Sequence, residues 1–289
     1  MKKPPWIKTR LTSGGASNVV NSALERGDLH TVCQSAMCPN KHECFHKGTA
    51  TFMILGNTCT RRCAFCAVGS GTPLPTDPGE PARVAKAARE LGLRHVVVTS
   101  VTRDDLADGG AGIFAAVIRE LKASLPDATV EVLTPDFSGR EKDLATVLSA
   151  GPDVFNHNLE TVRRLQEQIR SGADYERSLG VLRYAASWKP EVTVKSGLMV
   201  GLGETDAELF ATIDDLHAAG CQFLTIGQYL APSREHRAVE RYVEPAVFDK
   251  YRTYALAKGF KAVASAPLVR SSYNAGELLN SVEVARREW

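Results

Sequence analysis

The stretch ATFMILGNTCTRRCAFC, residues 50–66, joins an apolar run to a loop with three cysteines. The run from residue 50 to 56 is short, apolar and ends at glycine, which predicts a buried strand. Cys59, Cys63 and Cys66 follow at once in a C-x₃-C-x₂-C arrangement. Parallel α/β folds bind ligands at the carboxyl ends of their strands. The order of strand and cysteine loop therefore predicts a reactive site at that end of a sheet.

The rest of the chain repeats a strand-then-helix pattern about six times. Expected strands cover residues 50–56, 95–100, 129–134, 153–158, 192–200 and 222–227, and expected helices cover 80–91, 112–124, 141–150, 174–187, 206–219 and 245–258. This alternation predicts an α/β fold, a partial parallel (β/α)6-type barrel with helices outside. Residues 1–49 and 265–289 fall outside the repeat and are expected to be extensions packed on a barrel of residues 50–264.

Composition excludes several functional classes. The 289 residues carry a formal net charge of +2, which gives no support for nucleic-acid or membrane-surface binding. No apolar run approaches the ~18 residues of a membrane span. The start, MKKPPWIKTR, has no apolar stretch behind its basic residues, so it does not resemble a signal peptide. We therefore expect a cytoplasmic protein with neither nucleic-acid nor membrane partners.

Cysteine usage indicates metal binding. Six of the seven cysteines lie between Cys33 and Cys66, and the remaining one, Cys221, is expected to be a buried structural thiol. A large chain without a signal peptide is a poor candidate for a disulfide framework. Three thiolates in one tight loop suit a [4Fe–4S] cluster with one iron left open. Structural zinc, which favours four closed ligands, is the alternative.

The other triplet is Cys33, Cys38 and Cys44, spaced C-x₄-C-x₅-C ahead of the expected barrel. It lacks the C-x₂-C pair of a zinc hairpin, and a second cluster is the simplest use of three more thiolates. His42 and His46 are alternative ligands for a Cys/His metal site, although flanking histidines more often lie outside the ligand set.

The C-x₃-C-x₂-C loop, with Phe65 just before its last cysteine, resembles the radical S-adenosylmethionine (SAM) superfamily. The resemblance implies that SAM chelates the open iron and is cleaved by one electron to a 5′-deoxyadenosyl radical. It also implies SAM contacts from Phe65 and from residues after later strands: Thr99, Ser100, Asp104, Asn158, Glu160, Gly201 and Glu204. For Asn158 and Glu160 a helix N-cap is the competing interpretation. Arg61 and Arg62 either tune the charge of the cluster or are simply solvated.

Both triplets together resemble the lipoyl synthase family, and the similarity covers nearly the whole chain. It is carried by KPPWIK (3–8), HTVC (30–33), CPN (38–40), GTATFMILGNTCTRRCAFC (48–66), TSVTRDDLADGGA (99–111), PDFSG (135–139), NHNLETV (156–162), KSGLMVGLGE (195–204) and VRSSYNAG (269–276). Asn57 departs from the aspartate that is more common there. The RSSY motif implies that a serine completes the N-terminal cluster, Ser271 first and Ser272 as the alternative. Without the resemblance, RSSY would be interpreted as a polar turn.

The resemblance further implies a reaction and its partners. Octanoyl on a protein lysine would gain sulfur at C6 and C8, with one SAM for each insertion and the N-terminal [4Fe–4S] cluster as sulfur donor. Implied partners are octanoylated domains of 2-oxoacid dehydrogenase E2 and glycine cleavage H protein, a low-potential donor such as ferredoxin or flavodoxin, and a cluster-repair carrier. Rival interpretations are biotin synthase, a methylthiotransferase and a non-catalytic zinc-binding module.

Overall fold

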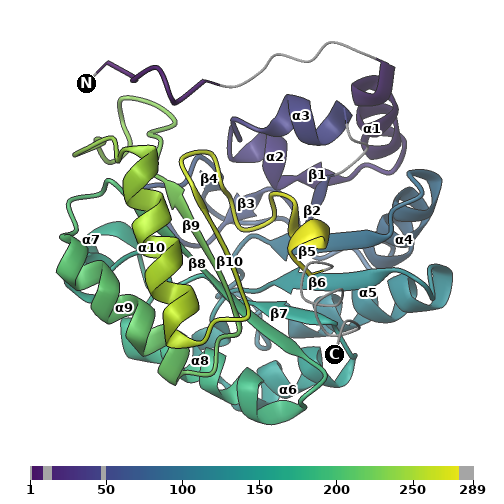
Figure 1. Cartoon of the computed structure of the whole chain (residues 1–289). Helices are drawn as coiled ribbons and strands as arrows, with labels where there is room; N and C mark the ends of the chain where they lie inside the picture. Colours follow the sequence, from purple (N-terminus) through teal and green to yellow (C-terminus); the bar gives the residue numbers. More distant parts are fainter. Residues whose placement is uncertain (1, 9–14, 47–49, 280–289) are drawn as a thin grey trace, which may run out of the picture. The chain divides into compact units, whose positions relative to one another are not determined.

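The computed structural model describes residues 2–8, 15–46 and 50–279. Parts of the expected extensions, residues 1, 9–14, 47–49 and 280–289, lie outside the described residues, as do Gly48 and Thr49 of the quoted cysteine motif. The chain divides into two compact units. Figure 1 labels the helices and strands in chain order. The N-terminal unit holds residues 9–62 and 66–155, and the C-terminal unit holds residues 1–8, 63–65 and 156–289.

Strands of the N-terminal unit are mostly parallel. Its larger sheet contains β1 (His30–Thr31), β2 (Thr51–Ile54), β5 (His95–Ser100) and β6 (Thr129–Leu133), and β7 (Val154–Asn156) ends as the chain enters the C-terminal unit. Ile54 pairs with Ser100 and Thr99 pairs with Leu133, so β2, β5 and β6 end at one edge. β1 pairs antiparallel with β2, so the expected N-terminal extension contributes a strand to this sheet.

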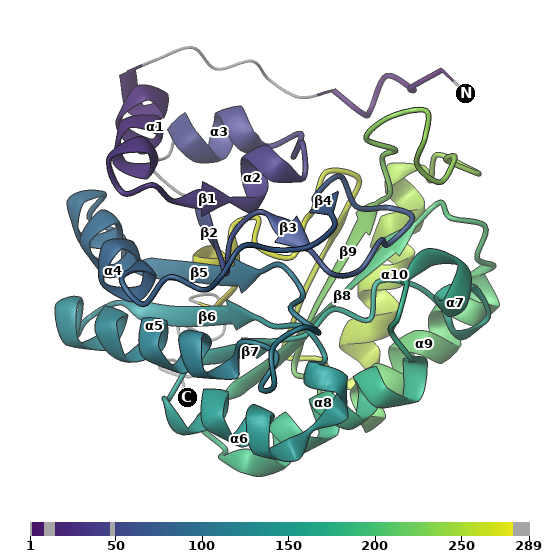
Figure 2. The same ribbon diagram turned by 180° about the vertical axis from the view of Figure 1, so that it is seen from behind.

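Helices flank these strands as the pattern predicted. The N-terminal unit contains α1 (Gly15–Arg26), α2 (Val32–Ser35), α3 (Lys41–His46), α4 (Glu80–Glu90), α5 (Ala111–Ser124), the 3₁₀ turn η1 (Phe137–Gly139) and α6 (Glu141–Ser149). α4 and α5 pack side by side (Figure 2). β5 is buried along Val96, Val97 and Val98, which explains its lack of polar alternation.

The C-terminal unit has three parallel strands, β8 (Thr193–Val200), β9 (Phe223–Gln228) and β10 (Ala262–Ala266). Its helical segments are η2 (Arg163–Leu165), α7 (Gln166–Ile169), α8 (Tyr175–Trp188), α9 (Asp206–Ala218) and α10 (Pro245–Lys258). α9 begins at a capping box between Thr205 and Glu208, in which each side chain accepts the other residue's backbone N–H. α10 begins with Pro245 and ends at Gly259, whose φ of 112° suits glycine.

All six expected strand–helix pairs are confirmed, with boundary shifts of a few residues. The strands β1 and β10 were not expected. β10 reads AVASA, and its small residues lack the bulky β-branched signal of the other strands. The expected boundary after residue 264 falls inside β10. β1 spans two residues, too few for a period to be visible.

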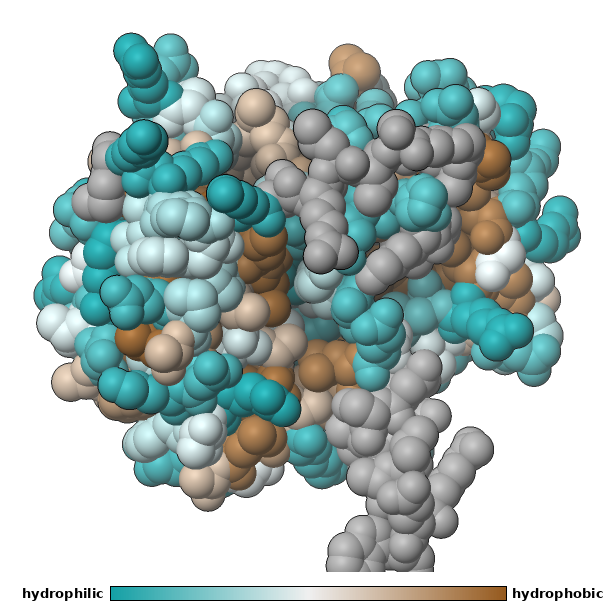
Figure 3. Space-filling view, turned by 45° about the horizontal axis from the view of Figure 1, so that its top comes forward, coloured by the Kyte–Doolittle hydropathy of each residue, from teal (hydrophilic) through white to brown (hydrophobic). Residues whose placement is uncertain are grey.

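In the part of the chain that the structure describes, no helix is both long and apolar enough to cross a membrane. Large apolar side chains exposed among those residues come from separate segments of the sequence: Trp6, Val19, Met37, Leu74 and Leu256. On the face drawn in Figure 3, hydrophobic patches alternate with hydrophilic surface.

Candidate active site

Cys59 lies at the end of the short strand β3 (Thr58–Cys59), which pairs in parallel with β4 (Gly69–Ser70). Its carbonyl oxygen accepts the N–H of Gly71 at 3.0 Å. Its Sγ accepts two backbone N–H groups, from Thr102 at 3.3 Å and from Arg61 at 3.4 Å. Thr102 lies two residues after the end of β5, so Cys59 is held at the carboxyl edge of this unit's sheet, as the sequence predicted.

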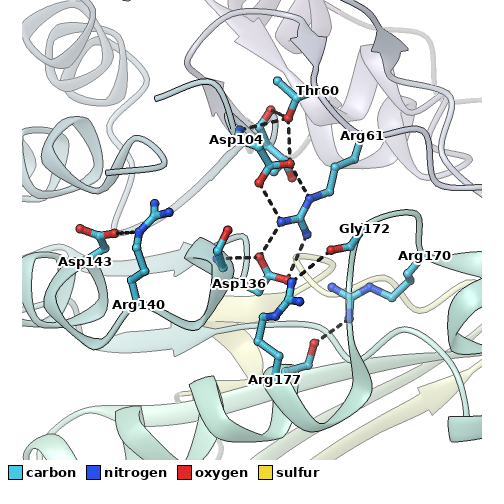
Figure 4. Close-up of polar contacts among 12 residues, drawn as sticks. Thr60, Arg61, Asp104, Asp136, Arg140, Asp143, Arg170, Gly172 and Arg177 are labelled. Atoms are coloured by element: carbon cyan, nitrogen blue, oxygen red, sulfur yellow. Dashed lines mark hydrogen bonds and ion pairs between the residues drawn. The ribbon is translucent and has the colours of Figure 1, made fainter. Parts of the chain in front are cut away.

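Arg61 is held by two aspartates (Figure 4). Its Nε and Nη2 donate to Asp104 at 2.8 Å each, and its Nη1 and Nη2 donate to Asp136 at 3.0 and 2.8 Å. The Arg61 side chain is 9% exposed and that of Asp136 is fully buried. Burial disfavours the charge, but the hydrogen bonds to Asp104 and Asp136 outweigh it and raise the pKa of Arg61 above its ordinary value. Arg61 is therefore not simply solvated.

Asp136 was quoted within a motif but not predicted as a site residue. It follows β6 and caps the 3₁₀ turn η1 through a 3.0 Å hydrogen bond from the Ser138 N–H. Its position after a parallel strand was the available signal, because strand ends were already expected to carry the site. The spacing of 75 residues between Arg61 and Asp136 concealed their contact.

Three residues at or after the carboxyl end of β5 were predicted to meet SAM. Thr99 donates to the Leu133 carbonyl at 3.0 Å, which satisfies its hydroxyl within the sheet. Both oxygens of Asp104 accept hydrogen bonds from Arg61, and Oδ2 also lies 3.1 Å from Thr60 Oγ1. The Ser100 hydroxyl oxygen, in contrast, is buried and has no hydrogen-bond partner among the described residues. Such an orphaned oxygen suits a polar ligand.

The segment Cys63–Phe65 belongs to the C-terminal unit. The Ala64 N–H donates to the carbonyl of Ile169, at the end of α7, at 2.9 Å, and the Ala64 carbonyl accepts the Arg237 N–H at 2.9 Å. Cys63 and Phe65 are both half-buried. The backbone N–H and carbonyl of Ala64, between these two residues, are thus both hydrogen-bonded within the C-terminal unit.

Asn158 and Glu160 follow β7. Asn158 Nδ2 donates to Glu160 Oε1 at 3.0 Å and to Ser271 Oγ at 2.6 Å, whereas its Oδ1 is buried with no partner among the described residues. The Glu160 backbone has a φ of 69°. Its N–H donates to the Gly197 carbonyl, and its carbonyl accepts the Met199 N–H. Burial raises the pKa of Glu160 above its ordinary value, although Arg170 and Asn158 act in the opposite direction. Asn158 Nδ2 thus donates to Glu160, a predicted SAM contact, and to Ser271, a predicted ligand of the N-terminal cluster.

Gly197 leaves the space that Asn158 occupies. A Cβ on Gly197 would lie 2.7 Å from Asn158 Oδ1 and 2.8 Å from Thr225 Oγ1. Real Cβ atoms do not approach other atoms so closely, so any side chain here must displace Asn158 or Thr225. The absence of a Cβ at Gly197 thus leaves room for the Asn158 amide, whose Oδ1 has no partner among the described residues.

Gly201 and Glu204 form a closed turn after β8. The buried Glu204 carboxylate accepts the N–H of Gly201 at 2.7 Å and that of Leu202 at 2.9 Å. Gly201 has a φ of 94°, and a Cβ there would lie 2.2 Å from Gln228 Nε2. Both residues therefore stabilise this turn, and their contact with SAM stays a prediction.

Two cysteines of the N-terminal triplet lie on short helices, and Cys38 lies in the turn between those helices. Cys33 is buried in α2, where its N–H donates to Thr31 Oγ1 at 3.2 Å. The Cys38 N–H donates to the Cys33 carbonyl at 3.1 Å, and the N–H of Cys44, in α3, donates to Asn40 at 2.9 Å. His42 and His46 are exposed. Arg62 is also exposed, and Ser272 is half-buried.

Ligand geometry is not fixed by the described residues. Within residues 2–8, 15–46 and 50–279, no three His, Cys, Asp or Glu side chains form a group that could hold a metal ion. Cys59 and Cys66 belong to one unit and Cys63 to the other. The two cluster ligand sets thus stay predictions from the sequence. Cys221 is buried, as expected, and burial raises the pKa of its thiol.

Comparison with known proteins addresses the family directly. The family model described as the radical SAM superfamily matches residues 53–216. The lipoyl synthase of Oleidesulfovibrio alaskensis is 55% identical over 275 residues, which cover 95% of this chain and 94% of that protein. The lipoyl synthase of a Geobacter species, strain M21, is 53% identical over 279 residues, covering 96% of this chain and 95% of that protein.

Solved structures agree on the fold. The FeFe-hydrogenase maturase HydG from Carboxydothermus hydrogenoformans superposes with a TM-score of 0.59 at 13% identity, covering 86% of this chain and 64% of that chain. This likeness shows the fold alone. It agrees with the mostly parallel strands and flanking helices of both units, and the expected radical SAM type of α/β fold is confirmed. Since the identity extends over nearly the full length of its curated relatives, the chain belongs to the lipoyl synthase family of radical SAM enzymes.

Proposed function

We propose that this chain inserts two sulfur atoms, at C6 and C8, into an octanoyl group carried on a protein lysine. The observation that carries the proposal is identity above 50% with lipoyl synthases over a span that includes both cysteine triplets and the RSSY motif. The reaction requires removal of hydrogen from unactivated carbon, and radical SAM chemistry performs that step.

Cys59, Cys63 and Cys66 are the proposed ligands of the SAM-binding [4Fe–4S] cluster. Three thiolates leave one iron open for the amino and carboxylate groups of SAM. When both are bound, the cluster would supply one electron that cleaves the sulfonium of SAM into methionine and a 5′-deoxyadenosyl radical. The chain's contribution is to fix the thiolates, and the backbone bonds to Cys59 Sγ support that role.

Ser100 and Asn158 are the proposed polar contacts of SAM that have most support, and Glu160, which accepts a hydrogen bond from Asn158, is proposed with them. Ser100 and Asn158 each carry a buried oxygen without a partner among the described residues, and such atoms are costly unless a ligand or water satisfies them. Phe65, Thr99, Asp104, Gly201 and Glu204 are proposed on the family resemblance.

Cys33, Cys38, Cys44 and Ser271 are the proposed ligands of the second [4Fe–4S] cluster, which would be the sulfur donor. A hard serine oxygen is poorly matched to iron that prefers soft thiolate, so this ligand is the one most easily released. Asn158 supports the proposal because its amide fixes the position of the Ser271 hydroxyl. Two SAM molecules would be used for each lipoyl group.

Proposed partners follow from the reaction. The octanoyl group would arrive on the lipoyl domains of 2-oxoacid dehydrogenase E2 or on glycine cleavage H protein. A low-potential donor such as ferredoxin or flavodoxin would reduce the cluster, and a carrier protein would rebuild the spent one. We propose the cytoplasm as the compartment, because six clustered thiols would persist in a reducing environment.

The test is an anaerobic reaction of the reconstituted protein with SAM, a reductant and an octanoyl-lysine peptide, followed by mass spectrometry. We expect two sulfurs per peptide and about eight irons with matching sulfide per chain. Formation of 5′-deoxyadenosine without sulfur insertion would contradict the lipoyl reaction and leave the radical SAM reaction standing. Zinc without sulfide would contradict both.

Matched cysteine variants locate the activity. Cys63→Ala should abolish SAM cleavage, whereas Cys221→Ala, which alters a buried thiol outside both triplets, should retain SAM cleavage and full iron content. Equal loss in the two variants would show that the effect is general destabilisation and not loss of a ligand.

A further inference from the structure

Residues 59–62, the Cys59 arm, are attached to the loop after β5 through Thr60. The Thr60 N–H and its Oγ1 both donate to the Thr102 carbonyl at 3.0 Å. The same Oγ1 lies 3.1 Å from Asp104 Oδ2 and accepts the Asp104 N–H at 3.1 Å. These bonds hold the backbone of the arm, but they do not hold the side chain that follows.

Arg61 fastens the arm to two loops at once. Its guanidinium grips Asp104 after β5 with one pair of donors and Asp136 after β6 with another, all at 2.8–3.0 Å (Figure 4). Two paired contacts of this kind need the planar fork of arginine, which the single ammonium of lysine cannot reproduce.

The acceptors are themselves fixed. Asp136 is fully buried, and its Oδ1 also accepts the Ser138 N–H. The Asp104 backbone bonds to Thr60. An arginine bound to two carboxylates at once has little rotamer freedom, so its side chain restrains the backbone from which it extends.

That backbone matters because its N–H points at the thiol. Cys59 Sγ accepts the Arg61 N–H at 3.4 Å and the Thr102 N–H at 3.3 Å. Hydrogen bonds to cluster sulfurs are one of the factors that set the reduction potential of an iron–sulfur centre. Because they stabilise negative charge on sulfur, their loss makes the potential more negative.

We propose that Arg61 is a positioning residue which, through Asp104 and Asp136, keeps both backbone N–H groups on Cys59 and so sets the potential of the SAM-binding cluster. This inference rests on the proposed function, since it requires Cys59 to be a cluster ligand. Arg62 is the next residue of the same arm and has the same charge, but its side chain is exposed.

The test measures the midpoint potential of the full-length holoprotein by electron paramagnetic resonance, with the cluster assigned by its spectral change on addition of SAM. Arg61→Lys keeps the charge and loses the fork, and Arg61→Gln loses both. We expect both variants to have lower potentials, with at least a tenfold fall in the reduced-to-oxidised ratio at fixed potential, which is about 59 mV for one electron. The control Arg62→Gln should stay within a twofold change of that ratio.

Asp104→Asn distinguishes geometry from charge and covers the case in which Arg61 variants do not fold. Removing a negative charge alone would raise the potential, whereas weakening the grip on Arg61 should lower it. A raised midpoint potential in Asp104→Asn would overturn the inference. So would an unchanged potential in Arg61→Lys, or a shift in Arg62→Gln as large as that in the Arg61 variants. A wild-type protein without any cluster would instead overturn the proposed function.

Discussion

The Asn158 side-chain nitrogen lies 2.6 Å from the hydroxyl oxygen of Ser271, a residue 113 positions further along the chain. The same nitrogen donates to Glu160. Asn158 and Glu160 are proposed SAM contacts, and Ser271 is a proposed ligand of the sulfur-donating cluster. One amide therefore holds side chains that would serve SAM and the N-terminal cluster, and a substitution of Asn158 should weaken the binding of both.

Asn158→Asp keeps the shape of the side chain but replaces the donating nitrogen with an acceptor. We expect it to weaken SAM binding and iron retention by the N-terminal triplet by about tenfold each, because two hydrogen bonds are lost and Glu160 meets a second carboxylate. Equilibrium dialysis with SAM and iron release to a chelator measure the two effects. Wild-type values for both would contradict the shared role.

Ser271→Ala should prevent sulfur insertion while leaving SAM cleavage by the other cluster intact. The variant removes the proposed fourth ligand, and we expect affinity for the N-terminal cluster to fall about 10–100-fold. The neighbouring Ser272→Ala is the matched control and should behave as wild type. Reversal of the two phenotypes would move the ligand to Ser272, and normal sulfur insertion in both would remove serine from the ligand set.

Gly197→Ala should destabilise the C-terminal unit by about 1–3 kcal/mol, because the added Cβ meets Asn158 and Thr225 at under 3.0 Å. Gly180→Ala is the matched control: it lies within α8, and a Cβ there meets nothing within 4 Å. That control should gain about 0.5–1 kcal/mol. Urea denaturation monitored by circular dichroism gives both values, and equal effects would contradict the steric explanation.

Glu204→Gln should cost about 1–3 kcal/mol of stability, since a fully buried carboxylate that accepts two backbone N–H groups is replaced by a weaker acceptor. Glu208→Gln, at the exposed N-terminus of α9, should cost under about 1 kcal/mol. If Glu204→Gln instead leaves the unfolding midpoint unchanged and weakens SAM binding, Glu204 is a ligand contact and not a structural one.

The buried carboxyl group of Glu80 should make the stability of the folded protein depend on pH. Its buried carboxylate accepts the Leu55 N–H at 2.9 Å, and burial raises its pKa above 4.5 despite that bond and the nearby Arg83. The folded state therefore binds its proton more tightly than the unfolded state, so this group's contribution is fully present below pH 4.5 and is lost as the pH rises through the raised pKa. Glu80→Gln should match wild type at low pH and become the more stable protein at pH 7. Parallel unfolding curves across this range would contradict the assignment.

The strand–helix alternation and the two triplets were predictable because they depend on local patterns. A buried run such as Val96–Val98 or a helix start such as Thr205 with Glu208 is determined by neighbours in sequence. β10 was missed because AVASA carries too little bulk to stand out from a loop. The interpretation of Arg61 stayed open because nothing near it in the sequence indicates which carboxylates it meets.

The sequence by itself determined the family, the order of the elements and the candidate thiolate ligands, since spacing along a chain is a local property. Tertiary structure alone decided the partners of those residues. Arg61 meets Asp136 and Asn158 meets Ser271 because parallel strands return distant segments to a shared edge, and no short-range pattern records that meeting. Residues 50–66 illustrate both: the cysteines of this loop could be identified in the sequence, whereas the contact between the Arg61 N–H and Cys59 Sγ is seen only in the fold.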